Sequence, residues 1–216
     1  MPYQPIYLST YILIYFTFAP MAKTVRKKAS KKDLILLQAS RMFREKGFPA
    51  TSMRDLAESI GIEAASLYNH IQSKSEILQE IIFRTANDCN LHLDTVENDG
   101  RDSIKKIESL IRFHVQMMVN RFDDYHVMIN EWIHLSNPYL VTFANQRRSY
   151  VQKMEAIIEE GVRTKQMKPV LPYVAMLTIL SSVRGLEFWQ RSTKKISAQV
   201  IEDNLVQHLI GGLKKN

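Results

Sequence analysis

Residues 51–78 read TSMRDLAESIGIEAASLYNHIQSKSEIL, and the pattern of apolar, capping and glycine residues in this segment indicates short helices joined by a tight turn. Its first apolar residues recur at i, i+3, i+4 and i+7, which predicts a short helix with one apolar face made by Met53, Leu56, Ala57 and Ile60. A hydroxyl from Thr51 or Ser52 can cap that helix. Gly61 ends it, because a residue without a Cβ can enter the left-handed backbone conformation of a sharp helix exit.

Two further helices follow this glycine at short intervals. The second begins near Ala65 and buries Leu67 and Ile71 against the first. Ser73 caps the third, and Glu76, three residues later, completes a capping box. Two short helices that cross over a tight glycine turn form a helix-turn-helix, whose second helix is presented to a DNA groove.

The same stretch resembles the DNA-binding domain of the TetR family of bacterial repressors, in the pattern T-S-x-x-D-L-A-x-x-x-G-I-x-x-x-S-L-Y-x-H-I-x-S-K-x-x-I-L. The marked positions of that pattern are Gly61, Leu67, Tyr68, His70, Lys74 and Leu78. The resemblance implies an all-α chain with an N-terminal three-helix helix-turn-helix domain. It also implies a larger C-terminal helical domain for effector binding and dimerisation.

The resemblance further implies which side chains meet DNA. Phosphate contacts are expected from Thr51, Tyr68, His70 and Lys74. Contacts to base edges are expected from four residues at the exposed start of the second helix: Ala64, Ala65, Ser66 and Asn69. The two alanines can offer only apolar contact, for instance to thymine methyl groups. Ser52 and Arg54 complete the expected DNA-binding set.

The distribution of charge agrees with a DNA-binding role for this part of the chain. The net charge is +7, and residues 23–76 hold 11 Lys or Arg against 6 Asp or Glu, as neutralisation of phosphates requires. Residues 23–32 form a basic arm, which is either solvated and disordered or laid along DNA. Cys89 is the single cysteine, so the sequence offers no disulfide framework and favours the cytoplasm.

The first residues differ in composition from all that follows, since residues 1–20 carry no charge. The apolar run over residues 6–19 is shorter than the roughly 20 residues of a membrane span. We therefore expect Met21 to be the biological start and residues 1–22 to be a non-native or disordered extension, with a single membrane anchor as the alternative. Residues 23–76 then form the basic arm and DNA-binding domain, and residues 77–216 form the ligand-binding and dimerisation domain.

The remainder of the chain predicts helices only. Apolar periodicity places them at residues 33–46, from 76 to 91 or beyond, and at 102–120, 123–137, 139–161, 173–190 and 197–213. No catalytic constellation accompanies them. Glu131 and His134 make one Glu-x-x-His, half of a di-metal signature, and no second pair exists, so a solvated or hydrogen-bonded pair is the expected reading. We expect no enzyme, no metal site and no cofactor.

The C-terminal domain concentrates Met and aromatic residues, most of which must be core. Adaptable methionines and flat aromatic walls also line pockets for apolar ligands. The expected ligand-binding residues are Met118, Phe122, Tyr125, Met128, Trp132, Phe143, Arg147, Met176 and Arg184. The segments VRGLEFW (183–189) and LIGGL (209–213) resemble the branch that senses acyl-CoA thioesters. Arg147, Arg148 and Arg184 are then candidate partners of a CoA phosphate, although a solvated helix face explains each arginine equally well.

A stripe of small residues suggests where two subunits would meet, because small side chains let helices approach closely. The expected dimerisation residues are Ala175, Thr178, Ser182, Gly185, Leu205 and Leu209. The sequence thus predicts a homodimeric repressor, released from an inverted-repeat double-stranded DNA operator by a small apolar or acyl-CoA effector. The alternatives are a helical partner-binding or membrane-tethered protein with a structural helix-turn-helix, and an activator without a small-molecule effector.

Overall fold

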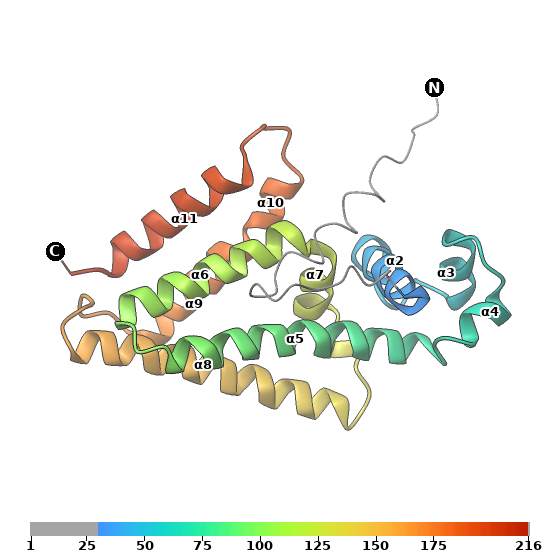
Figure 1. Ribbon diagram of the computed structural model, residues 1–216, viewed down its shortest axis with the longest axis horizontal. Helices are drawn as coiled ribbons and strands as arrows, with labels where there is room; N and C mark the ends of the chain where they lie inside the picture. Colours follow the sequence, from blue (N-terminus) through green and yellow to red (C-terminus); the bar gives the residue numbers. More distant parts are fainter. Residues whose placement is uncertain (1–29, 216) are drawn as a thin grey trace, which may run out of the picture.

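The computed structural model describes residues 30–215, and all regular elements within them are helices (Figure 1). The predicted extension at residues 1–22 and residues 23–29 of the basic arm lie outside the described residues, and the last two residues of the arm, Lys31 and Lys32, begin α2. The elements are α2 (Lys31–Lys46), α3 (Met53–Ser59), α4 (Ala64–Tyr68), α5 (Lys74–Asn98), α6 (Ser103–Asn120), α7 (Phe122–Asn130), the 3-10 turn η1 (Trp132–His134), α8 (Tyr139–Arg163), α9 (Pro172–Arg184), α10 (Leu186–Gln190) and α11 (Ala198–Leu213). The all-α prediction is confirmed.

Side-chain caps and glycines set the ends of the first helices. Ser30 caps α2 in a reciprocal capping box with Asp33, so the helix starts two residues before its predicted start. Ser52, one of the two expected capping residues, forms the same box with Asp55 at the start of α3. Gly61 has a φ of 71°, the left-handed conformation that was expected after this helix. The local signals of the DNA-binding stretch therefore act as predicted.

Helix α5 runs from the short helices at one end of the molecule to the core at the other (Figure 1). Its first half buries Ile77, Leu78 and Ile81 among the residues of α2, α3 and α4. Its second half buries Leu93 and Val96 in a separate cluster with α6, α8 and α9. A single 25-residue helix therefore belongs to both halves of the molecule.

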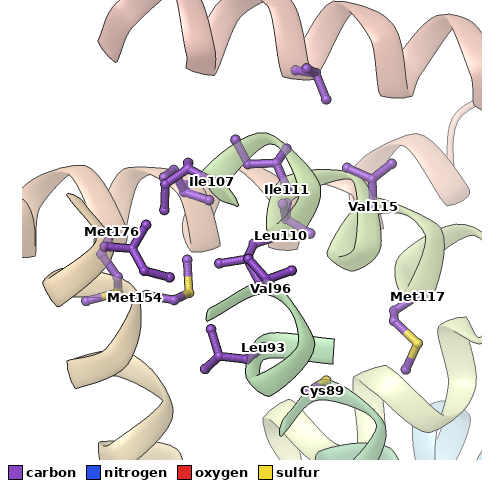
Figure 2. Packing of buried hydrophobic residues seen from close by; sticks show 14 of the residues in the cluster. Cys89, Leu93, Val96, Ile107, Leu110, Ile111, Val115, Met117, Met154 and Met176 are labelled. Atoms are coloured by element: carbon purple, nitrogen blue, oxygen red, sulfur yellow. The ribbon is translucent and has the colours of Figure 1, made fainter. Parts of the chain in front are cut away.

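The larger core lies where α5, α6, α8 and α9 meet (Figure 2). Leu93 and Val96 face Ile107, Leu110 and Ile111 of α6, and all of them are buried. Met154 of α8 and Met176 of α9 fill the adjoining space with flexible thioether side chains. Helix α11 packs across α6 and α9 on the outer side of this core (Figure 1).

Two predicted helices are wrong in extent. The segment at 123–137 divides into α7 and η1, and Asp123 does not cap it, because its carboxylate pairs with Arg44 of α2. The segment at 173–190 divides at Gly185 into α9 and α10. A Cβ placed on Gly185 would lie 3.2 Å from the carbonyl oxygen of Ser182, so the backbone is closely folded there.

The smaller core crosses the boundary expected at residue 76. Val127, Leu135 and Phe143, from α7 to α8, are buried in one cluster with α2, α3, α4 and the first half of α5. The DNA-binding helices are therefore packed directly on the C-terminal part of the chain. No helix among residues 30–215 is both long and apolar enough to span a bilayer.

Candidate DNA-binding face and effector cavity

Helices α3 and α4 form a helix-turn-helix whose inner side is sealed by aliphatic residues. Leu56 of α3, Leu67 of α4 and Ile71 just after α4 are all 1% exposed or less. Helix α4 has only five residues, so this burial, rather than its own hydrogen bonds, holds it in place. The arrangement leaves the opposite side of α4 turned toward solvent.

The outward side carries most of the residues assigned to DNA. Six of them are exposed on α3, on α4 or directly after α4: Arg54, Ala64, Ala65, Tyr68, Asn69 and His70. Ser66 is half-buried, and the exposed Ser52 accepts the backbone N–H of Asp55 with its hydroxyl oxygen at 3.1 Å. Most residues expected at DNA are therefore accessible on α3, on α4 or directly after α4.

Thr51 does not belong to that surface, contrary to its assignment as a phosphate contact. Its side chain is buried, with a residue exposure of 2%, and its hydroxyl donates to the carbonyl oxygen of Gly47 at 3.0 Å. A threonine with this geometry fixes the turn between α2 and α3. The hydroxyl of Thr51 is visible in the sequence, but its inward direction depends on the packing of the turn.

Lys74 is also occupied inside the protein. Its ammonium nitrogen donates to the carbonyl oxygens of Phe48 and Pro49 at 2.8 and 3.2 Å, and it lies 4.4 Å from the centre of the Phe48 ring. These contacts tie the start of α5 to the turn between α2 and α3. In the DNA-free chain Lys74 thus helps to position α3 and α4, and its direct contact with a phosphate stays a prediction.

The same turn is held from its other side by Glu131 and His134. The Phe48 N–H donates to Oε2 of Glu131 at 3.0 Å, and the His134 ring stacks on the Phe48 ring with centres 5.5 Å apart. Nε2 of His134 lies 3.6 Å from the same carboxylate oxygen. The expected hydrogen-bonded reading of this Glu-x-x-His is confirmed. We call Phe48, Lys74, Glu131 and His134 the Phe48 clamp.

A polar seam joins α2 to α7 beside this clamp. The hydroxyl of Ser40 donates to Asp124 at 2.6 Å, and Arg44 pairs with Asp123. Burial raises the pKa of Asp123, and the nearby Arg44 opposes that shift. The DNA-binding helices are thus joined to α7 by paired side chains as well as by apolar packing.

The opposite side of α7 faces a cavity of about 580 Å³. Helices α5, α6, α7, α8 and α9 and the turn η1 all contribute to its wall, which is mainly apolar. Seven of the expected ligand-binding residues line it: Tyr125, Met128, Trp132, Phe143, Arg147, Met176 and Arg184. The size and lining are typical of a site for a small organic ligand.

Met118 and Phe122 were assigned to the ligand and do not line this cavity. Met118 is buried in the larger core, and its backbone carbonyl accepts a hydrogen bond from Gln190. Phe122 lies under the guanidinium group of Arg44, 5.5 Å from the ring centre, and against the ring of His126. Both residues face away from the cavity, a distinction that composition alone cannot make.

Several residues that line the cavity were not among the expected ligand-binding residues. One of them, His114, forms the centre of a buried hydrogen-bonded group. Its Nδ1 lies 2.7 Å from the hydroxyl oxygen of Tyr125, and its Nε2 lies 2.8 Å from that of Tyr150. Burial lowers the pKa of His114 to about 4 and raises the pKa values of both tyrosines. All three groups are therefore uncharged near neutral pH. Tyr150 belongs to the Met and aromatic concentration of this domain, but nothing local marks His114.

Three arginines stand at the edge of the cavity, as the comparison with CoA-sensing regulators implied. Arg147, Arg148 and Arg184 all line it and are exposed. The Arg147 guanidinium lies 5.4 Å from the centre of the Trp132 ring, and Arg184 donates to the side-chain oxygen of Asn130. The cavity thus combines an apolar interior with a positively charged edge.

The residues expected at a dimer interface occupy different environments. Thr178 is exposed, and Ser182, Gly185, Leu205 and Leu209 are half-buried, whereas Ala175 is buried within its own chain. Larger apolar side chains are exposed just before α9, on α9 and on α11, namely Leu171, Val174 and Val200, whereas the exposed Tyr173 and Leu177 of α9 line the effector cavity. We call this surface of α9 and α11 the α9–α11 face. It is richer in large apolar residues than the small-residue stripe suggested.

Comparison with known protein families covers both halves of the chain. Residues 35–81 match the family described as bacterial regulatory proteins, tetR family. Residues 100–213 match the tetracyclin repressor-like C-terminal domain. The HTH-type transcriptional repressor KstR2 of Mycolicibacterium smegmatis is 23% identical over 195 residues, which span 89% of this chain and 95% of KstR2. The biofilm operon regulator IcaR of Staphylococcus aureus is 35% identical over 98 residues, 40% of this chain and 53% of IcaR.

Solved structures show the same fold. The ketosteroid transcriptional regulator KstR2 of Mycobacterium tuberculosis superposes with a TM-score of 0.81 at 19% identity, over 88% of this chain and 98% of KstR2. AibR in complex with isovaleryl coenzyme A and operator DNA gives a TM-score of 0.73 at 20% identity, over 84% of this chain and 98% of AibR. The chain therefore belongs to the TetR family of bacterial regulatory proteins, as a DNA-binding transcriptional regulator and not an enzyme.

Proposed function

We propose that the protein is a dimeric repressor of the bacterial cytoplasm whose hold on an inverted-repeat operator is released by an acyl-CoA thioester. One observation carries the proposal: α7 and η1 form a wall of the cavity and also bind the DNA-binding helices. The repressors KstR2 and IcaR among the relatives, and the isovaleryl coenzyme A and operator DNA bound to AibR, support the same function.

The cavity suits the two chemical parts of such an effector. An acyl chain requires an apolar space of sufficient size, which the cavity of about 580 Å³ offers with its mainly apolar wall. Phosphate groups require cationic donors near the exit of that space, and arginine is well adapted to bind phosphate with two parallel hydrogen bonds. Arg147, Arg148 and Arg184 supply such donors at the edge of the cavity.

Ligand control follows from residues that belong to both sites. Trp132 and Phe143 line the cavity and also pack on the smaller core that contains the DNA-binding helices. Trp132 lies next in sequence to Glu131, which holds the Phe48 N–H. A ligand that displaces Trp132 would therefore move the turn between α2 and α3. A preference of about 1–3 kcal/mol for the shifted state would change DNA affinity roughly 5–150-fold.

We assign the dimer contact to the α9–α11 face. Its support is the groove between α9 and α11, which has a volume of about 380 Å³ and a mainly apolar lining, since exposed apolar surface of this kind marks interaction sites. A two-fold axis through this face would relate the two copies of α4. The operator would then be an inverted repeat with half-sites about 34 Å apart, the spacing of successive major grooves.

The experiment combines DNA release with intrinsic fluorescence. Acyl-CoA thioesters of increasing chain length are titrated into the protein bound to its promoter DNA, with free CoA and the free acids as controls. Release from DNA and a change in tryptophan emission are expected in the same concentration range, because Trp132 lines the cavity.

Two variants identify the reporting tryptophan. Trp132→Phe should lose the ligand-dependent emission change, and Trp189→Phe should keep it, because the Trp189 N–H donates to the carbonyl of Ile196 away from the cavity lining. An acid that releases the DNA where no CoA ester does would remove the acyl-CoA effector and leave a ligand-responsive regulator. An absence of sequence-specific DNA binding would overturn the whole proposal.

A further inference from the structure

The Tyr125–His114–Tyr150 group contains one more hydrogen-bond donor than it uses. A neutral imidazole has one N–H and one bare nitrogen, and each tyrosine hydroxyl has one hydrogen. One tyrosine must donate to the bare nitrogen, and the other must accept the N–H. The accepting tyrosine keeps its own hydrogen, and its hydroxyl has no other hydrogen-bond partner among residues 30–215.

Tyr150 is the tyrosine better placed to hold this spare hydrogen. Both hydroxyls belong to residues that line the cavity, but Tyr150 is 9% exposed and Tyr125 only 4%. The His114 Nε2–H then donates to Tyr150, while Tyr125 donates to Nδ1. In this arrangement the Tyr150 O–H keeps a hydrogen without a partner at the wall of the cavity, where an acceptor oxygen of a ligand can meet it.

Gln146 adds a second polar group to the same wall. It lies four residues before Tyr150 on α8, so the two side chains share one face of the helix, roughly 5–6 Å apart at their Cβ atoms. Gln146 lines the cavity, and its side-chain oxygen is buried without a hydrogen-bond partner among the described residues. Buried acceptors normally have partners, so an unpaired one beside a cavity indicates a donor supplied by a ligand.

We infer that Tyr150 and Gln146 read the thioester linkage itself, with Tyr150 donating to the thioester carbonyl and Gln146 accepting from the first pantetheine amide N–H. The inference rests on the proposed acyl-CoA effector and deepens it. Only a sulfur and a short ethylene bridge separate that carbonyl from that amide, which matches two side chains one helical turn apart. His114 and Tyr125 act through Tyr150 as positioning residues, because they orient its hydroxyl.

The test compares two ligands that differ only at the carbonyl. Octanoyl-CoA carries the thioester, and S-octyl-CoA is the corresponding thioether, with a methylene in place of the carbonyl. Their dissociation constants are measured by calorimetry on the full-length protein. Wild type should bind octanoyl-CoA about tenfold more tightly, the value of one neutral hydrogen bond in a water-excluded site. This ratio does not depend on the folding of any variant.

Three variants then assign the contacts. Tyr150→Phe should bring the ratio close to one, whereas Tyr125→Phe, which keeps the Tyr150 hydroxyl but removes a group that orients it, should lower the ratio without bringing it to one. Gln146→Met should weaken both ligands about equally, since both carry the pantetheine amide. Equal binding of the two ligands to wild type, or a ratio unchanged by Tyr150→Phe, would overturn the inference while the acyl-CoA effector stands. If neither ligand binds, the proposed acyl-CoA effector is wrong, and the role inferred for Tyr150 is wrong with it.

Discussion

The DNA-binding face and the effector cavity are built in opposite ways. The exposed residues assigned to DNA come from one short stretch, and the helix that carries most of them, α4, has five residues. The cavity wall collects residues from Ala86 to Arg184, across α5 to α9. The DNA-binding face is therefore a local surface that is supported by the core beneath it. The cavity, in contrast, forms only when the long helices pack together.

This difference explains how one can control the other. The DNA-binding helices lack a large core of their own, and their smaller core is completed by Val127, Leu135 and Phe143 from the C-terminal part. Phe143 also lines the cavity. A change in the cavity therefore reaches the support of α3 and α4 without passing through the exposed residues. The proposed function therefore places DNA reading on α3 and α4, assembly on the α9–α11 face and control in the elements between them.

The largest expected effect is the loss of dimerisation through a substitution that leaves the DNA-binding helices unchanged. Thr178→Arg places a charge on the exposed α9–α11 face, far from α4 in the sequence. If this face is buried in a dimer, an unpaired charge there should cost roughly 3–5 kcal/mol of association energy. Sedimentation should show monomers, and binding to a full operator should fall by at least about a hundredfold.

Thr95→Arg is the matched control for that substitution. Thr95 is also an exposed helical threonine, and its hydroxyl donates to the carbonyl four residues earlier at 2.8 Å, as that of Thr178 does at 2.9 Å. It lies on α5, outside the α9–α11 face. The control should stay dimeric and bind DNA normally. A dimeric Thr178→Arg protein would contradict the assignment of this face.

A second prediction concerns the pH dependence of the cavity. Burial lowers the pKa of His114 from 6.5 to about 4, with a smaller contribution from His92. The unfolded chain therefore binds a proton that the folded chain does not bind between these values. The free energy of unfolding should be highest above pH 6.5 and fall by about 3 kcal/mol as the pH drops to about 4.

Urea unfolding at a series of pH values measures this effect, with His114→Gln as the comparison. The variant keeps a polar side chain but has no imidazole, so its stability should fall less steeply over the same range. Other histidines contribute about equally to both proteins, and the difference between the two curves isolates His114. Parallel curves would show that His114 binds its proton in the folded protein as readily as in the unfolded chain.

Features that depend on neighbouring residues could be predicted from the sequence, whereas features that depend on distant segments could not. The caps, Gly61 and the apolar spacing of α3 lie within a few residues of one another, so they identified the helix-turn-helix. The inward roles of Thr51 and Lys74 could not be found in this way. Lys74 meets Phe48 across 26 residues, and only the packed turn shows that its ammonium group is already bound.

The cavity shows the limit of composition as a guide. Five of the seven Met and aromatic residues expected near a ligand line the cavity, but composition does not tell which face of a helix turns inward, so it could not show that Met118 and Phe122 lie outside the lining. His114 meets Tyr125 and Tyr150 across 11 and 36 residues, on three different helices. Such a group has no sequence motif, because only the relative packing of α6, α7 and α8 creates it.

A third prediction tests the connection between the two sites. Glu131→Ala removes the acceptor of the Phe48 N–H and leaves that donor without its partner, at a cost of about 1–3 kcal/mol. The DNA affinity without effector should fall, and the effector should lower it less than in wild type, since part of the Phe48 clamp is already open. Anisotropy of labelled operator DNA, with and without effector, measures both quantities.

Ile133→Ala provides the control, because Ile133 lies in the same turn η1 and its side chain is exposed. It should change neither the DNA affinity nor the effector response. If Glu131→Ala responds to the effector as strongly as wild type, control does not pass through the Phe48 clamp. The remaining structural connection would then be the α2–α7 seam of Ser40, Arg44, Asp123 and Asp124.

The smallest effect separates two cations that the sequence alone could not tell apart. Arg54→Met and Lys74→Met each remove one positive charge and keep a linear apolar side chain. Arg54 is exposed on α3, so its loss should reduce the slope of log affinity against log salt by about one and leave stability unchanged. The ammonium group of Lys74 is bound to the carbonyls of Phe48 and Pro49, so its loss should lower stability by about 1 kcal/mol and weaken DNA binding with an unchanged slope. Salt titrations of both variants on one operator decide the matter. A slope reduced by one in Lys74→Met would mean that this ammonium group leaves the turn and grips a phosphate when DNA binds.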